Sequence, residues 1–68
     1  MVHPAIIFVS SNDLDRTITV AIQGIRYEYI IGDGYEGALQ TYLTMNTKSP
    51  GKALAWLKKR AKSYTKLA

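Results

Sequence analysis

The sequence predicts a small α+β domain in which a three-stranded antiparallel β-sheet is followed by two α-helices (β-β-β-α-α). Apolar and polar residues alternate over residues 17–22 and 25–31, whereas after Gly34 the apolar residues recur with the spacing of a helix. The length of 68 residues allows one domain, because a chain this short buries only about 60% of its unfolded surface. A composition of 47% hydrophobic and 21% charged residues is that of a folded chain. We therefore expect a single domain over residues 1–68.

Three short segments rich in β-formers predict the strands: residues 5–9, 17–22 and 25–31. In the second segment Ile18, Val20 and Ile22 point to one face, so we expect them to be buried. Thr17 and Thr19 point to the other face and should be more exposed.

Two turns separate these strands. Residues 12–15 contain Asn and Asp side chains, which form hydrogen bonds with nearby backbone groups and so favour a turn. The pair Gln23-Gly24 lies between two alternating segments and predicts a hairpin.

The first helix is expected over residues 35–45. Asp33 and Glu36 have the spacing of a capping box, in which two side chains satisfy the free amides of the first turn. Asn46 is expected to end the helix in a left-handed conformation. The apolar side of this helix is formed by Tyr35, Leu39, Tyr42 and Leu43.

After a loop over residues 47–51, the last helix is expected over residues 50–66, with Ser49 as its N-cap and Pro50 in the first turn. At about 100° per residue the helix is amphipathic. Its apolar face contains Ala53, Leu54, Leu57, Ala61 and Tyr64. Its basic face contains Lys52, Lys58, Lys59, Lys62 and Lys66.

Trp56 lies at the boundary of these faces, one turn before Arg60, and its indole can stack against the Arg60 guanidinium. Two roles are open for this ring. It is either the largest core anchor of the helix or an aromatic platform for unpaired bases beside the lysines. We favour the core role, because so small a domain needs the apolar area.

The charge distribution favours a polyanionic partner. The chain has nine Lys+Arg and five Asp+Glu, for a net charge of +4. The first 36 residues hold all five acids and two bases, giving −3, whereas residues 37–68 hold seven bases and no acid, giving +7. Such a basic half indicates binding to nucleic acid. The alternative is a solvated face that only keeps the domain soluble.

The sequence offers little for catalysis. The absence of cysteine excludes disulfide frameworks, zinc knuckles and thiol nucleophiles, and His3 is the single histidine. Asp13 and Asp15 indicate a turn rather than a metal site, and Gly32-Asp33-Gly34 indicates a helix cap rather than a phosphate loop. We therefore expect no enzyme activity, metal or cofactor. The longest apolar runs have five residues, against about 20 for a membrane span, so we expect no membrane contact. Because the N-terminus lacks the pattern of a signal peptide and the chain has no cysteine, we expect a cytoplasmic protein or a virus-encoded one that acts in a cytoplasm.

Tyr27 and Tyr29 form the most distinctive motif. On a strand both rings project from one face, about 6.6–7 Å apart, where they could stack two successive bases. Alternatively they pack under a helix as part of the core, and we favour burial because this sequence has few other aromatic residues for a core.

Residues 15–20 and 24–29 resemble the KTSC domain, which is named for the C-terminus of some lysyl-tRNA synthetases and also occurs as a small stand-alone protein. The mark of that family is a central Tyr-x-Tyr motif, matched by Tyr27 and Tyr29. A following helical tyrosine is matched by Tyr35.

A later Ser-x-Gly-basic turn of the family is matched by residues 49–52, so that the resemblance extends over about residues 8 to 64. Relative to the family, the spacing from Tyr29 to Tyr35 is shorter and that from Tyr35 to Ser49 is longer. The cluster of Asn and aromatic residues after the turn is missing. The resemblance implies RNA binding, the role usually suggested for this family.

We expect a non-catalytic nucleic-acid-binding domain, with RNA as the ligand that the resemblance implies. The expected contact residues are Lys52, Lys58, Lys59, Arg60, Lys62, Lys66, Trp56, Tyr27 and Tyr29. The alternative is a protein–protein interaction module, such as a small virus-encoded inhibitor or modulator that docks on an acidic host protein. An uncovered sheet face or an apolar dimer patch would favour that alternative.

Overall fold

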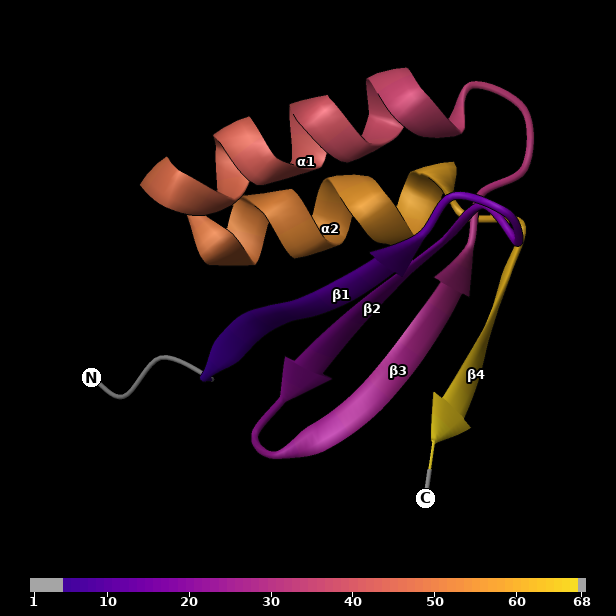
Figure 1. Cartoon of the computed structure of the whole chain (residues 1–68). Coiled ribbons are helices and arrows are strands. Elements are labelled where there is room, and N and C mark those ends of the chain that lie inside the picture. The colour runs from indigo at the N-terminus through magenta and orange to yellow at the C-terminus, as the bar shows by residue number, and fades with distance from the viewer. Residues whose placement is uncertain (1–4, 68) are drawn as a thin grey trace.

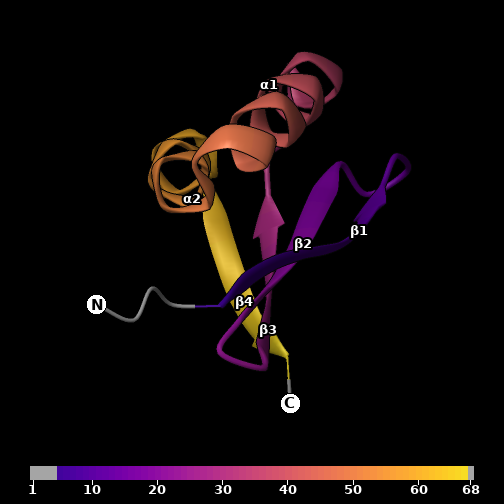
Figure 2. The same ribbon diagram turned by 90° about the vertical axis from the view of Figure 1, so that its left-hand side faces the viewer.

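Four strands and two helices make up the part of the chain that the computed structural model describes, residues 5–67 (Figure 1). In chain order they are β1 (Ile6–Asn12), β2 (Thr17–Ile22), β3 (Ile25–Ile30), α1 (Tyr35–Lys48), α2 (Pro50–Arg60) and β4 (Ser63–Leu67). The strands form one antiparallel sheet in the order β1-β2-β3-β4. Both helices lie on the same side of that sheet (Figures 1 and 2). The predicted α+β class with an antiparallel sheet and two helices is confirmed.

The expectation of three strands followed by two helices is wrong at the C-terminus. The last helix ends at Arg60 instead of continuing to residue 66, because Ala61 adopts an extended backbone with φ −70° and ψ 140°. The Lys62 amide then donates a hydrogen bond to the Ile30 carbonyl at 2.8 Å, and β4 pairs with β3. Tyr64 and Thr65 are residue types that strands favour. Strand β3, which would otherwise be an edge with unpaired backbone groups, gains a neighbour.

The predicted β2–β3 hairpin is confirmed. Gln23 and Gly24 have φ values of 53° and 83°, and two positive φ values at adjacent positions characterise the type I′ turn that suits a two-residue hairpin. The resulting register places Ile22 opposite Ile25 and Val20 opposite Tyr27.

The turn between β1 and β2 is also confirmed. The Asn12 side-chain oxygen accepts hydrogen bonds from the amides of Leu14 and Asp15 at 2.9 and 3.0 Å. Strand β1 extends beyond the predicted end at residue 9 as far as Asn12, because β2 pairs with it across a bulge between Phe8 and Ser10.

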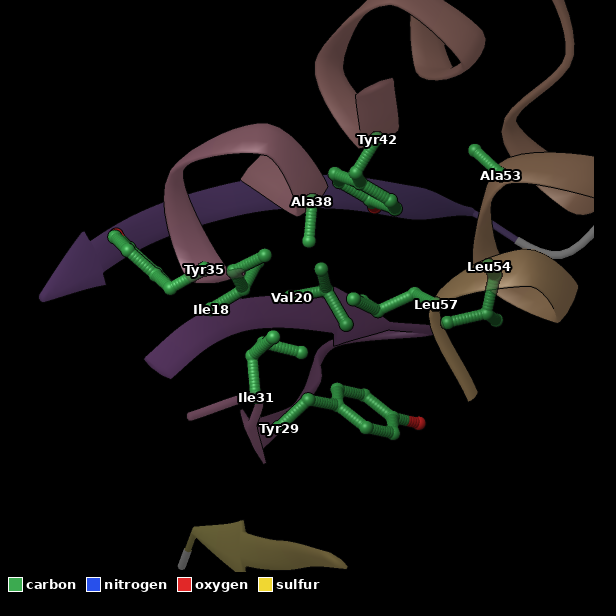
Figure 3. Close-up of a cluster of buried hydrophobic side chains, with 10 residues drawn as sticks. All are labelled: Ile18, Val20, Tyr29, Ile31, Tyr35, Ala38, Tyr42, Ala53, Leu54 and Leu57. Carbon is green, nitrogen blue, oxygen red and sulfur yellow. The ribbon is translucent and has the colours of Figure 1, made fainter. Parts of the chain in front are cut away.

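A buried cluster between the sheet and the helices forms the core (Figure 3). Its members are Ile18, Val20, Tyr29, Ile31, Tyr35, Ala38, Tyr42, Ala53, Leu54 and Leu57. Ile18 and Val20 are fully buried as expected, and Ile22 is half-buried. The expected exposure of Thr17 and Thr19 is wrong, since only 4% and 7% of their surface is accessible. Both lie on a central strand, where neighbours on β1 and β3 flank these short side chains.

The predicted capping box is wrong. The N-cap of α1 is Gly34, with φ 78°, and no side chain caps the helix. Gly32 and Gly34 both have positive φ, and between them Asp33 faces solvent, where its carboxylate forms a salt bridge with Arg16 at 3.2 Å. The first turn of α1 instead has backbone contacts, including a hydrogen bond from the Ala38 amide to the Gly34 carbonyl.

The two helices meet at a single residue. Helix α1 continues past Asn46, the predicted end, to Lys48, and Ser49 separates it from α2 in place of the predicted loop. The Ser49 amide donates to the Met45 carbonyl and the Ser49 carbonyl accepts from the Ala53 amide. Ser49 and Pro50 begin α2 as predicted, although the Ser49 side chain makes no capping bond.

On α1, Tyr35 and Tyr42 are buried as expected and Leu39 is half-buried. Leu43, also predicted on the apolar side, is exposed, and Ala38 takes a place in the core instead.

Two isoleucines on the sheet offer a matched test of this core. Replacing the fully buried Ile18 with Ala should lower the free energy of unfolding by about 2–5 kcal/mol, because the change leaves a cavity. Replacing Ile7, whose surface is 60% exposed, with Ala should change it by less than about 0.5 kcal/mol. Urea titrations followed by circular dichroism would measure both. Equal losses would contradict the assigned faces.

Candidate nucleic-acid interface

A groove of about 580 Å³ opens where the C-terminal end of α2 passes over β3 and β4. Three tyrosines and two lysines line it, together with small or apolar residues. We call this feature the tyrosine groove; its lining is Tyr27, Tyr29, Tyr64, Lys58, Lys62, Ile22, Ala61 and Ser63. It brings together residues from three separate parts of the sequence.

Strand pairing assembles the aromatic part of the groove. Alternation along β3 directs Tyr27 and Tyr29 toward the helix side of the sheet. Antiparallel pairing then places Tyr64 opposite Tyr29 and Lys66 opposite Tyr27, on the same side. The Tyr64 ring centroid lies 5.6 Å from that of Tyr29 and 6.0 Å from that of Tyr27. These separations are those of interacting aromatic pairs.

The three rings differ in accessibility. Tyr29 belongs to the core, with 3% of its surface exposed, and Figure 3 shows its ring among the buried side chains. Tyr27 is half-buried, and Tyr64 is 62% exposed. The favoured burial of the Tyr27–Tyr29 pair is therefore confirmed for Tyr29, whereas Tyr27 is only half-buried. The expectation that Tyr64 packs on the apolar face of a helix is wrong.

Three lysines lie around these rings. Lys58, in the last turn of α2, and Lys62, in the connection to β4, line the groove, and Lys66 lies opposite Tyr27. The Lys62 amine lies against Gly32, only 2.9 Å from the point where a Cβ would stand. A side chain at position 32 would therefore displace Lys62.

The lining of the groove contains no carboxylate. Glu28 lies between the two tyrosines of β3, and strand alternation directs it to the opposite face. Within residues 5–67 the structure shows one salt bridge, between Arg16 and Asp33, and it does not involve the groove. The lysine charges around the rings are thus available to an anion.

The remaining predicted site residues lie elsewhere on α2. Arg60 stacks on the Trp56 indole, 5.6 Å from the ring centroid, as the spacing predicts. Trp56 is half-buried against the core, which agrees with its favoured role as an anchor. The two-residue step from Trp56 to Lys58 turns about 200° around the helix, so the indole lies far from the tyrosine groove. Lys52 and Lys59 are exposed on the side of α2 that points away from the core.

The single basic helix face expected from the sequence is therefore divided. Lys62 and Lys66 are not helical, and only Lys58 among the lysines of α2 lines the groove. Sequence reasoning missed Tyr64 as a groove residue, because its spacing from Leu57 and Ala61 also fits a helix. The neighbouring strand-favouring residues Tyr64 and Thr65 were the signal that could have identified it.

A second cavity of about 390 Å³ lies at the start of α1. Its lining holds three carboxylates, Asp13, Asp33 and Glu36, and one guanidinium, Arg16, so its net negative charge opposes phosphate binding at the glycine-rich turn. Among residues 5–67 no group of three or more Asp, Glu, His or Cys side chains is placed to hold a metal ion. His3 lies outside the described residues. Neither of the two described helices has the length and apolar character that crossing a membrane requires.

Comparisons with protein-family models, with curated proteins and with solved structures give no match to this chain. The resemblance of Tyr27, Tyr29 and Tyr35 to the KTSC motif therefore stays a prediction from the sequence.

Burial raises the pKa of the Tyr29 phenol above its ordinary value of 10.0, and the neighbouring Tyr64 and Tyr27 phenols add to this effect. The stability that depends on the neutral phenol is fully present below pH 10.0 and is lost as the pH rises through the raised pKa. Tyr29→Phe keeps the ring but cannot ionise there. Its free energy of unfolding should fall less steeply at alkaline pH than that of the wild type, in urea titrations at increasing pH. Identical curves would contradict the burial of this phenol.

Proposed function

We propose that this chain is a small, non-catalytic nucleic-acid-binding domain whose contact surface is the tyrosine groove with its surrounding lysines. The observation that carries the proposal is that Lys58 and Lys62 line a groove of aromatic rings with no carboxylate in the lining, while Lys66 lies opposite Tyr27 on the adjoining strand. We place the protein in the cytoplasm, since a chain without cysteine requires no oxidising compartment.

This combination of side chains suits the two chemical parts of a nucleotide. Lysine ammonium groups bind phosphates and release the counterions that the phosphates had condensed. Aromatic side chains stack against bases that are not held inside a duplex. The wider charge distribution supports the same partner, because residues 37–68 carry seven basic residues and no acidic one.

The choice of RNA over DNA rests on the sequence resemblance. Tyr27 and Tyr29, which match the Tyr-x-Tyr motif of the KTSC domain, lie in the groove. Residues 49–52, which match its Ser-x-Gly-basic turn, lie at the junction of the helices, outside the groove. We therefore propose RNA as the first ligand to test, with DNA of the same sequence as the comparison.

Salt dependence tests the role of the lysines in and beside the groove. For single strands the logarithm of the affinity should fall with the logarithm of salt concentration by about 0.7 per phosphate contact. Replacing Lys58, Lys62 and Lys66 together with Gln should flatten that slope by about 2, since about 0.7 is lost for each of the three contacts. Fluorescence anisotropy with labelled single-stranded RNA at several salt concentrations would measure it.

A second triple variant provides the matched control. Replacing Lys48, Lys52 and Lys59 with Gln removes the same net charge from surfaces outside the groove lining, and should change the slope much less. Equal flattening by both variants would show that total charge, not the groove, sets the affinity. A folded wild-type protein that binds neither RNA nor DNA at low salt would overturn the proposed function.

One observation favours the alternative of a protein–protein module. Both helices cover the same face of the sheet, so no described element covers the other face (Figures 1 and 2). On that face Ile7, Ala21, Arg26 and Leu67 form a cross-strand row, and Ile7 is exposed. A contiguous apolar patch on an uncovered sheet face, rather than Ile7 alone, is what would indicate a surface that binds another protein or a second copy of the chain.

Self-association through this face is directly testable. If a second copy docks there, sedimentation equilibrium should give a dimer mass for the wild type and a monomer mass for Ile7→Glu. Leu14→Glu is the control, because Leu14 is an exposed apolar residue in the turn after β1. A monomeric wild type at all accessible concentrations would remove the second copy from the candidate partners of this face.

A further inference from the structure

Strand β4 contributes Ser63 and Tyr64 to the groove and no side chain to the buried core. None of the buried core residues among residues 5–67 comes from β4, and four of its five residues are exposed. The strand is attached to the rest of the domain by its backbone pairing with β3 and by the contacts of the Tyr64 ring. A large aromatic side chain that the core does not use is thus presented at the surface.

Tyr64 is the groove tyrosine with a largely free ring. Tyr29 is buried and Tyr27 is half-buried, so neither offers a whole face to a ligand. Tyr64 is 62% exposed, yet it contacts both neighbouring rings, tilted by 35° against Tyr29 and by 60° against Tyr27. Contacts with two neighbouring rings restrict its rotamers, which lowers the entropy cost of stacking a ligand on it.

Resting on the proposed function, we infer that the tyrosine groove takes one unpaired nucleotide at a time, with its base stacked on Tyr64 and its phosphate bound by the surrounding lysines. Because Tyr64 is the one largely exposed ring of the groove, it can stack against one base. A base inside a duplex is stacked between its neighbours, so it cannot present a face to Tyr64 unless it leaves the stack.

The size of the groove agrees with this ligand. Its volume of about 580 Å³ lies within the range of about 300–1,000 Å³ that small-molecule and cofactor sites occupy. The same chemistry has two sources, a nucleotide within a single strand and a free nucleoside monophosphate. Both present one aromatic base and one phosphate group to the rings and lysines.

Trp56 does not compete for this role. The Arg60 guanidinium already lies over its ring, and the ring is half-buried against the core. Stacking a base on Trp56 would require Arg60 to move.

Anisotropy titrations with three ligands and two variants test the inference. The ligands are a short fluorescent oligouridine, a blunt RNA duplex of the same length, and unlabelled uridine monophosphate as a competitor. We expect the single strand to bind more tightly than the duplex. Tyr64→Leu should weaken single-strand binding by about 5- to 150-fold, the measured range for one base stacked on an aromatic ring. Tyr64→Phe, which keeps the ring, should bind as the wild type does.

The outcomes separate this inference from the proposed function. If duplex and single strand bind equally, or if Tyr64→Leu binds as the wild type while the lysine triple variant loses affinity, the inference is wrong and phosphate binding stands. If no nucleic acid binds the folded wild type, both fail. If uridine monophosphate competes with the oligouridine, a free nucleotide is also a ligand of the groove. If it does not compete, the ligand is a nucleotide within a strand. Both outcomes agree with stacking on Tyr64.

A measurement on the wild type guards against a variant that does not fold. In heteronuclear NMR spectra, oligouridine should shift the amide resonances of Tyr27, Lys62 and Tyr64 and leave those of Ile7 and Ala21, on the uncovered face, unchanged. Shifts confined to the uncovered face would overturn the inference.

Discussion

The pairing of β3 with β4 is the constraint on which the proposed site depends. It joins residues 63–67, the last part of the described chain, to a strand that otherwise lies at the edge of the sheet. The hydrogen bond from the Lys62 amide to the Ile30 carbonyl begins this pairing directly after α2 ends. Without it Tyr64 and Lys66 would have no fixed position relative to Tyr27 and Tyr29. The groove therefore depends on the backbone ladder between two strands, one of which carries the core residue Tyr29.

Stability and binding are assigned to different members of one aromatic cluster. Tyr29 is buried and belongs to the core, whereas Tyr64 faces solvent and packs one side against it. This arrangement explains why both interpretations of the Tyr27–Tyr29 motif are reasonable from the sequence. Core burial fixes Tyr29, and Tyr29 in turn positions the ring that we propose as the stacking surface. The Trp56–Arg60 pair contributes to packing along α2 and lies outside the groove.

The sequence predicted those elements that depend on interactions between residues close together in the chain. Neighbouring residues were enough to predict three features. These are the turn at Gln23 and Gly24, the turn at Asn12 and the start of α2 at Pro50. The end of α2 could not be predicted in this way, because the spacing of Leu57, Ala61 and Tyr64 fits a helix and only pairing with the distant β3 overrides it. The Asp33 cap failed because Gly34 occupies the N-cap position, and the exposed Asp33 carboxylate pairs with Arg16, 17 residues away. Of the predicted site residues, Tyr27, Tyr29, Lys58 and Lys62 line the groove and Lys66 pairs with Tyr27 beside it, whereas Tyr64 was missed.

The most direct test of this account is whether residues 61–67 are a strand in solution. Nuclear Overhauser spectra of the free protein should show contacts between the ring protons of Tyr29 and Tyr64, together with strand-type sequential contacts from Ser63 to Leu67. The Lys62 amide, which donates to Ile30, should exchange slowly with deuterium. The contradicting result would be helical contacts, between residues three and four positions apart, that continue through Lys66 without any Tyr29–Tyr64 contact. It would show that β3 and β4 do not pair and that the proposed site does not exist.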